Sequence, residues 1–187
     1  VINLKKDSRN LGGGSWIFFA VIIFSFACTI FSQTISSKID SLEVELTKTS
    51  NKTEQCKLNY IIAQNYAYTD PHSGIEHAQR GLELARELKL TDRICSFYNI
   101  IGLSNFYLSK YTEAIKYFKL SLVEAKKLKD EESVVNATIN LGMVYYYSQF
   151  YDIALGILIE GVELAEKHQY TNQFSIGLSL MASVYLE

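Results

Sequence analysis

The fold of this chain is decided by residues 131–170, which read EESVVNATINLGMVYYYSQFYDIALGILIEGVELAEKHQY. Small and apolar residues recur in this stretch at steps of three and four, which is the period of a helix with one buried face. The pattern breaks near Ser148 and Gln149, so it predicts two helices joined by a short turn. The same pattern returns at a fixed spacing of 40 residues toward the N-terminus.

Aligned at this spacing, the chain keeps small residues small and apolar residues apolar. The columns are Ala85, Ala125 and Ala165; Gly81, Ser121 and Gly161; Ile61, Ile101, Leu141 and Met181; Ile62, Gly102, Gly142 and Ala182; and Ile75, Ile115 and Leu155. A fixed period between about 20 and 50 residues is typical of a solenoid of stacked helical units. One unit cannot bury its apolar stripe alone, so at least about three must stack.

The periodicity predicts helices over residues 53–68, 71–89, 92–108, 111–128, 131–148, 151–168 and 172–187. We expect Asp70 to cap the second of them and Pro71 to be its first residue. The candidates to cap later helices are Thr91 or Asp92, Asp130, and Thr171 or Asn172. Where partner helices approach closely, we expect the small residues Gly102, Gly142, Ala114 and Ala154, because each glycine costs about 1 kcal/mol of helix propensity relative to alanine.

These residues resemble the tetratricopeptide family. The matching pieces are Leu141-Gly142-Met-Val-Tyr145, Tyr151-Asp-Ile-Ala154, Ile101-Gly102 and Tyr111-Thr-Glu-Ala114. The first unit departs, since Ile62 replaces the glycine and Gly74 replaces the alanine. The 40-residue period exceeds the family's usual length of about 34, so the chain looks like a long-helix variant. HEAT-type repeats have a similar length, but the Leu-Gly-x-x-Tyr and Tyr-x-x-Ala pieces favour the tetratricopeptide family.

The resemblance implies an all-α fold, a right-handed α-solenoid of antiparallel helix hairpins. It covers residues 53–187, with units over about 53–90, 91–130 and 131–170 and a partial unit over 171–187.

A segment of a different kind precedes the repeats. Lys5, Lys6 and Arg9 stand before the apolar run WIFFAVIIFSFACTIF, residues 16–31. This is the pattern of a secretory signal peptide or of an uncleaved membrane anchor, and both remain open because the run is shorter than the ~20 residues that comfortably cross a bilayer. We expect residues 1–33 to be this signal or anchor helix, with membrane attachment through residues 16–31 if it is uncleaved.

Residues 34–52 are expected to be a lead-in helix or linker, with Ile39, Leu42 and Leu46 on one face. The leader predicts export, either to the periplasm or to the outer side of the inner membrane. Its Phe-Ser-Gln ending, residues 31–33, resembles the leaders of Gram-negative Bacteroidetes proteins.

Composition and motifs favour binding over catalysis. The 18 Lys and Arg and 20 Asp and Glu leave a net charge of −2, which argues against nucleic acid as a partner. His72, His77 and His168 lack the spacing of a metal pair on one helical face, and no catalytic or phosphate-binding motif is present. We predict no enzymatic activity, no cofactor and no metal, and we expect Cys56 and Cys95 to be buried fillers.

By the resemblance, the first helix of each unit lines a concave groove that binds a peptide or protein. Carried over by position, the groove residues are Tyr66, Asn99, Leu103, Phe106, Tyr107, Asn136, Asn140, Met143, Tyr146 and Tyr147. Asn amides can bond to an extended backbone, and rings and Met supply apolar contact. The rings suit packing between neighbouring units equally well. No basic residue lies between Arg93 and Lys110 or from Ser133 through Asp152, so the ligand is expected to be neutral or apolar rather than an acidic chain end.

The last residues suggest that more structure follows. The partial unit that ends at Glu187 carries the apolar residues Leu178, Leu180, Met181, Val184 and Tyr185. A terminal repeat normally has a polar outer face, so we expect further repeats beyond Glu187, or self-association through this open repeat.

Two functions fit the sequence. The first is a protein–protein interaction scaffold of the bacterial envelope. The second is the sensory input region of a membrane-bound signalling protein, such as a histidine kinase, whose output domain lies elsewhere; a repeat-fronted transcription regulator is a weaker third. An apolar span after Glu187 would favour the signalling protein.

Overall fold

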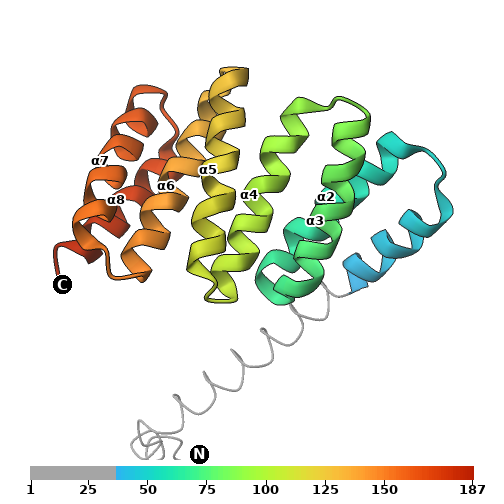
Figure 1. Ribbon diagram of the computed structural model, residues 1–187, viewed down its shortest axis with the longest axis horizontal. Coiled ribbons are helices and arrows are strands. Elements are labelled where there is room, and N and C mark those ends of the chain that lie inside the picture. The colour runs from blue at the N-terminus through green and yellow to red at the C-terminus, as the bar shows by residue number, and fades with distance from the viewer. Residues whose placement is uncertain (1–36) are drawn as a thin grey trace, which may run out of the picture. The chain divides into compact units, whose positions relative to one another are not determined.

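The computed structural model describes residues 37–187, and these residues are helical apart from short turns (Figure 1). Residues 37–48 form a helix within the expected lead-in segment, and we call it the lead-in helix. The helices that follow are α2 (Lys52–Thr69), α3 (Pro71–Glu87), α4 (Thr91–Tyr107), α5 (Tyr111–Leu128), α6 (Glu131–Tyr147), α7 (Tyr151–Lys167) and α8 (Thr171–Val184). Every bound of these helices lies within three residues of the range expected from the periodicity. The all-α class is confirmed, since the described residues include no strand.

Successive helices pair as antiparallel hairpins, α2 with α3, α4 with α5 and α6 with α7, and the hairpins stack side by side in chain order (Figure 1). The first helices of the hairpins also touch one another, α2 with α4, α4 with α6 and α6 with α8. The second helices, α3, α5 and α7, make no such contacts. The described repeats are therefore a tetratricopeptide-like solenoid, and we call the layer formed by α2, α4, α6 and α8 its inner face.

The close approaches within each hairpin occur where the small columns predict them. A Cβ added to Gly102 would lie 2.8 Å from the ring of Phe118, and one added to Gly142 would lie 2.6 Å from Leu158. Phe118 and Leu158 are fully buried, so neither side chain has room to move aside. Each glycine thus lets a large side chain of the partner helix pack where a Cβ of the first helix would otherwise stand.

The turns between helices share one backbone geometry. Lys89, Ser109, Lys129, Gln149 and Gln169, each twenty residues after the last, have φ between 56° and 65°, and none is glycine. After the first of these positions the N–H of Leu90 donates to the carbonyl of Ala85 at 2.8 Å, and equivalent bonds close the other four turns. This is the Schellman arrangement, in which a left-handed residue ends one helix and the next residue starts the following one.

The turn geometry corrects part of the expected capping. Asp70 and Asp130 are caps as predicted, and their carboxylates accept the backbone N–H of the residue three further on, at 3.4 and 3.1 Å. The other cap candidates, Thr91 or Asp92 and Thr171 or Asn172, are wrong. Because the Schellman turn is so short, α4 is preceded by Leu90 and α8 by Tyr170, and neither side chain caps its helix.

Cys56 and Cys95 are buried and free, as expected of small fillers. Their sulfur atoms lie 3.6 Å from the carbonyl oxygen of Gly81 and 3.4 Å from that of Ser121. Burial also raises the pKa of the Cys56 thiol, which keeps it protonated and unreactive.

The predicted signal or anchor segment, residues 1–33, lies outside the described residues. From residue 37 to residue 187, the chain contains no helix of the length and apolarity that a membrane crossing requires. The repeats belong to a compact unit that runs from Leu42 to Glu187.

Candidate functional site

A hollow of about 560 Å³ opens on the inner face. It is lined mainly by the first helices, through Tyr60, Gln64, Ala67 and Tyr68 of α2, Cys95, Ser96, Asn99, Ile100 and Leu103 of α4, Ser121 of α5, Glu132, Ser133 and Asn136 of α6, and Asn172 of α8. Asn99, Leu103 and Asn136 of the expected groove set are among them. Glu132 is the one charged residue of this lining.

Amide side chains join neighbouring first helices across this face. The Nδ2 of Asn140 donates to Oδ1 of Asn99 at 2.9 Å, and the Nε2 of Gln173 donates to Oδ1 of Asn136 at 3.3 Å. Because both oxygens are used in this way, the N–H₂ groups of Asn99 and Asn136 keep their two donors each. Neither group donates to another described residue, so the hollow presents unpaired donors.

A row of rings runs along one edge of the inner face, and we call Tyr68, Tyr107, Phe106, Tyr147 and Tyr146 the aromatic row. Consecutive members contact edge to face, with centroids 5.3, 5.4, 5.1 and 5.2 Å apart in that order. Such contacts contribute about 0.5–1.5 kcal/mol each beyond area burial. The row thus links α2, α4 and α6, and Tyr68 belongs both to it and to the hollow.

Three tyrosines of the row remain largely open to solvent. Tyr68, Tyr107 and Tyr147 are 56%, 48% and 51% exposed. Burial raises the pKa of the Tyr107 phenol, and the nearby phenols of Tyr68 and Tyr147 raise it further. None of the three hydroxyls bonds to another described residue.

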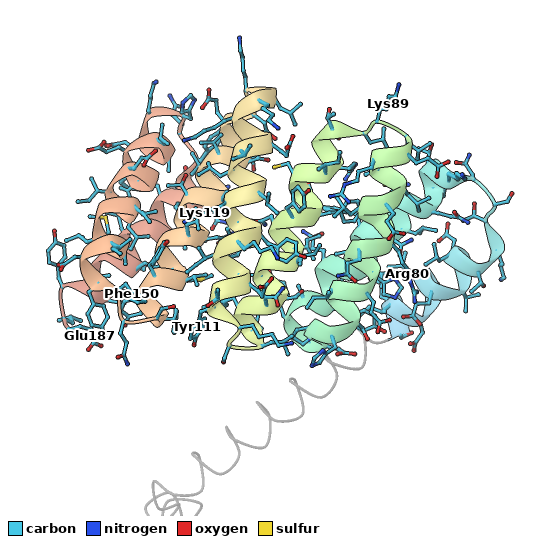
Figure 2. The ribbon with its side chains drawn as sticks, viewed as in Figure 1. Arg80, Lys89, Tyr111, Lys119, Phe150 and Glu187 are labelled. Carbon is cyan, nitrogen blue, oxygen red and sulfur yellow. The ribbon has the colours of Figure 1, made fainter. Side chains whose placement is uncertain are left out.

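The aromatic row lies along the edge of the solenoid that is formed by the C-terminal ends of the first helices. Figure 2 shows Tyr111 and Phe150, which stand at the starts of α5 and α7, at this end, and Lys89 at the opposite end. The ring of Tyr111 contacts Phe106 at 6.0 Å. Phe150 is 56% exposed, and its ring lies 6.3 Å from that of Tyr145, which is not a member of the row.

Tyr66 does not lie with the other expected groove residues. Its hydroxyl donates to Oε1 of Glu43 at 2.9 Å, and its ring lies 6.0 Å from that of His77, so it faces the lead-in helix and α3. Each residue turns a helix by about 100°, and the α2 residues that reach the hollow include Gln64 and Tyr68, four apart. Tyr66 lies halfway between them and points away.

The remaining expected residues have mixed surroundings. Asn140 bridges to Asn99, whereas Tyr146 packs against Tyr151 and the core of the third hairpin. Met143 is half-buried on α6. Sequence reasoning missed several lining residues, namely Tyr60, Gln64, Tyr68, Ser96, Glu132, Ser133 and Asn172. The four-residue steps of Tyr60, Gln64 and Tyr68 were the available signal for α2.

His77 is the most buried of the described histidines and is held in a polar contact between helices. Its Nδ1 lies 3.0 Å from Oδ1 of Asn59, and its Nε2 lies 3.8 Å from Oε1 of Glu43. Burial lowers its pKa below 6.5, with a smaller contribution from Arg80. Among residues 37–187 there is no group of three or more His, Cys, Asp or Glu side chains that could hold a metal ion.

No family model and no curated protein matches this chain, but solved structures share its fold. Aspartyl phosphate phosphatase F from Bacillus subtilis has a TM-score of 0.74 and 14% identity, over 81% of this chain and 43% of its own. The apo form of RapI has a TM-score of 0.70 and 20% identity, over 82% of this chain and 44% of its own. A Rap protein complexed with competence and sporulation factor has a TM-score of 0.73 and 17% identity, over 87% of this chain and 46% of its own.

These neighbours are tetratricopeptide-like helical solenoids, in agreement with the fold expected from the sequence. At such low identities the likeness is one of fold alone. The chain spans less than half the length of each neighbour.

Proposed function

We propose that the described repeats form a binding scaffold that holds an extended segment of a protein or peptide on the inner face. The observation that carries the proposal is the pair of amide bridges, which leaves the N–H₂ donors of Asn99 and Asn136 unpaired within the hollow. An extended backbone offers a carbonyl acceptor at every residue, so a chain lying along the hollow can satisfy these donors.

The fold neighbours support a binding role. One of them is complexed with competence and sporulation factor, so a solenoid of this type accommodates a bound factor in that protein. For the present chain, the lack of Lys and Arg in the lining of the hollow points to a neutral or apolar ligand.

The setting of this scaffold is proposed from the sequence. The leader of residues 1–33 supports export and an envelope location, either as a free scaffold or as the input region of a membrane-bound signalling protein. A fusion of the leader and repeats to an enzyme active only outside the cytoplasm tests the location. Activity of the fusion supports export, and inactivity despite normal expression contradicts it. That the repeats themselves are not an enzyme stays a prediction.

Peptide selection tests the binding role. A random peptide library displayed on phage is panned against the full chain, and selected peptides are then titrated by fluorescence anisotropy. Asn99→Ala and Asn136→Ala should each weaken binding about five- to ten-fold, since each removes a side-chain amide of the protein that donates to the ligand. The matched control is Lys119→Ala, an exposed residue of α5 (Figure 2), and it should leave affinity unchanged. A library that yields no binder, or binders equally insensitive to all three changes, would refute the proposal.

A further inference from the structure

The outer layer of the solenoid, formed by α3, α5 and α7, departs from the repeat on α7. At three positions spaced by three residues the first two units are polar, with Ser73, Glu76 and Gln79 on α3 and Glu113, Lys116 and Lys119 on α5. The equivalent residues of α7 are Ile153, Gly156 and Ile159. Ile153 and Ile159 are 49% and 38% exposed, so α7 presents apolar side chains to solvent where the other second helices are polar.

Gly156 lacks the close approach that explains the other glycines of the described helices. At each of those glycines an added Cβ would lie 3.0 Å or less from a neighbouring atom, whereas one added to Gly156 would meet nothing within 4 Å. A glycine inside a helix still lowers helix propensity relative to alanine. A close approach from outside the chain would explain Gly156, as the ring of Phe118 explains Gly102.

The carboxylates of α7 are also unmatched. Among residues 37–187, none of its four acids takes part in an ion pair, and they are Asp152, Glu160, Glu163 and Glu166. The one basic residue of α7 is Lys167, in its last turn. Both acids of α5, in contrast, pair with a lysine of the same helix, Glu113 with Lys116 at 3.2 Å and Glu124 with Lys127 at 2.8 Å. The outer face of α7 is therefore both apolar and uncompensated in charge, and we call it the acidic strip.

The preceding second helix, α5, has the opposite charge. The ion pairs within α5 leave Lys119 and Lys126 without a carboxylate partner in the described part of the chain. Leu120 and Val123 are exposed between them, at helical steps that place all four side chains on one face. We call this face of α5 the basic strip.

A basic strip beside an acidic strip is complementary to itself. Rotation by 180° about an axis that runs between the strips, parallel to the helices, lays the basic strip of one copy on the acidic strip of another and the acidic strip on the basic one. Such a contact closes at two copies, which is the commonest symmetry of protein oligomers. Lys126 and Glu166 are equivalent in the repeat, so they stand at the same level of the stack and meet across this contact.

We propose that two copies of this chain associate through the outer faces of α5 and α7, with the exposed Ile, Leu and Val side chains at the centre and the unpaired Lys and Glu side chains around them. Helices of 17 and 18 residues are about 26 Å long, so the two strips offer roughly 500 Å² per copy, near the lower limit of specific interfaces. We therefore expect a dissociation constant of about 10–100 μM. The contact lies on the outer layer, so its success or failure leaves the proposed binding role of the inner face untouched.

Charge reversal tests the contact in the full chain. Donor-labelled and acceptor-labelled copies are mixed over concentrations that bracket this value, and energy transfer between them reports association. Glu163→Lys with Glu166→Lys makes both strips basic, and Lys119→Glu with Lys126→Glu makes both acidic. Each double variant alone should associate at least about ten-fold more weakly than the native chain, because like charges then face one another. An equal mixture of the two double variants should regain the native affinity, since opposite charges meet again.

Two further variants sharpen the test. Glu76→Lys with Glu83→Lys on α3 shifts the net charge as far as the reversal on α7 does, and it should leave association unchanged. Gly156→Gln adds an uncharged side chain and improves helix propensity, so it should retain the fold but weaken association at least about ten-fold by blocking the close approach. Circular dichroism of each variant verifies that the helices are retained.

Each remaining outcome overturns the proposal. Energy transfer that is equal in the native chain and in both double variants would show association through another segment, such as the apolar run of residues 16–31. A mixture of the double variants that fails to associate would exclude the pairing of α5 with α7. A native chain that stays monomeric would also exclude it. If a helical peptide of Leu and Lys then binds, and the α7 reversal abolishes that binding, the acidic strip belongs to a basic helix of another protein.

Discussion

Replacing Gly81 with alanine should destabilise the stack, although alanine is the better helix former. Gly81 lies within α3, and a Cβ at this position would lie 2.2 Å from Cζ and 2.4 Å from Cε1 of Phe97 on α4. Phe97 is fully buried and its ring packs edge to face on Tyr60 at 5.8 Å, so it cannot swing away freely. The substitution therefore forces two neighbouring hairpins apart.

The magnitude follows from two opposing effects. Alanine gains about 1 kcal/mol of helix propensity over glycine. Overpacking a filled core costs about 1–3 kcal/mol, and a contact this short belongs at the upper end. We expect the free energy of unfolding to fall by about 1–2 kcal/mol, as measured by urea denaturation followed by circular dichroism.

Gly156 provides the matched control. It also lies inside a helix, α7, but it is exposed and a Cβ there would meet nothing within 4 Å. Gly156→Ala should therefore raise stability by about 0.5–1 kcal/mol through helix propensity alone.

A double variant tests the contact itself. Phe97→Leu shortens the opposing side chain, so it should cost less stability beside Ala at position 81 than beside the native Gly81. The reasoning is refuted if Gly81→Ala is as stabilising as Gly156→Ala, or if the two changes at 81 and 97 are additive.

Four further changes test single contacts by urea denaturation. Burial holds the pKa of His77 below 6.5, so the unfolded chain binds a proton more readily than the folded one. The free energy of unfolding should therefore be at its full value above pH ~6.5 and fall as the pH drops toward the lowered pKa. His77→Gln should remove this dependence of stability on pH. Lys110→Asp should add about 1 kcal/mol by capping α5, which has no side-chain cap, as Asp130 caps α6. Lys129→Gly should add about 0.5–1 kcal/mol by relieving its left-handed backbone, with φ of 56°. Ser104→Ala should add about 1 kcal/mol, because the buried Oγ of Ser104 has no partner among the described residues. A persisting slope in the His77 variant, or a loss of stability in any of the other three, would contradict the corresponding argument.

Helix positions and the repeat could be read from the sequence because they depend on local periodicity. The columns at a spacing of 40 residues record which residues face the core, and the core is the same in every unit. Caps such as Asp130 are equally local, since the side chain bonds only three residues away. The close approach at Gly142 followed from the same logic, because a helix interior tolerates glycine where a neighbour needs the space.

The conformation of the turns between helices could not be predicted from local sequence signals. The signal for a left-handed helix end is glycine, and this chain uses Lys, Ser and Gln at those positions instead. The sequence thus carried no mark of the Schellman turns, and the caps proposed for α4 and α8 were each placed one or two residues too late.

The binding face depended on tertiary structure. A helix turns by about 100° per residue, so the rotation of α2 in the stack brings Tyr68 to the hollow and sends Tyr66 toward Glu43. Asn140 reaches Asn99 across 41 residues of sequence, and only the packing of α4 on α6 makes them neighbours. Composition supplied the rings and amides, but the orientation of each packed helix decided which of them a ligand can reach.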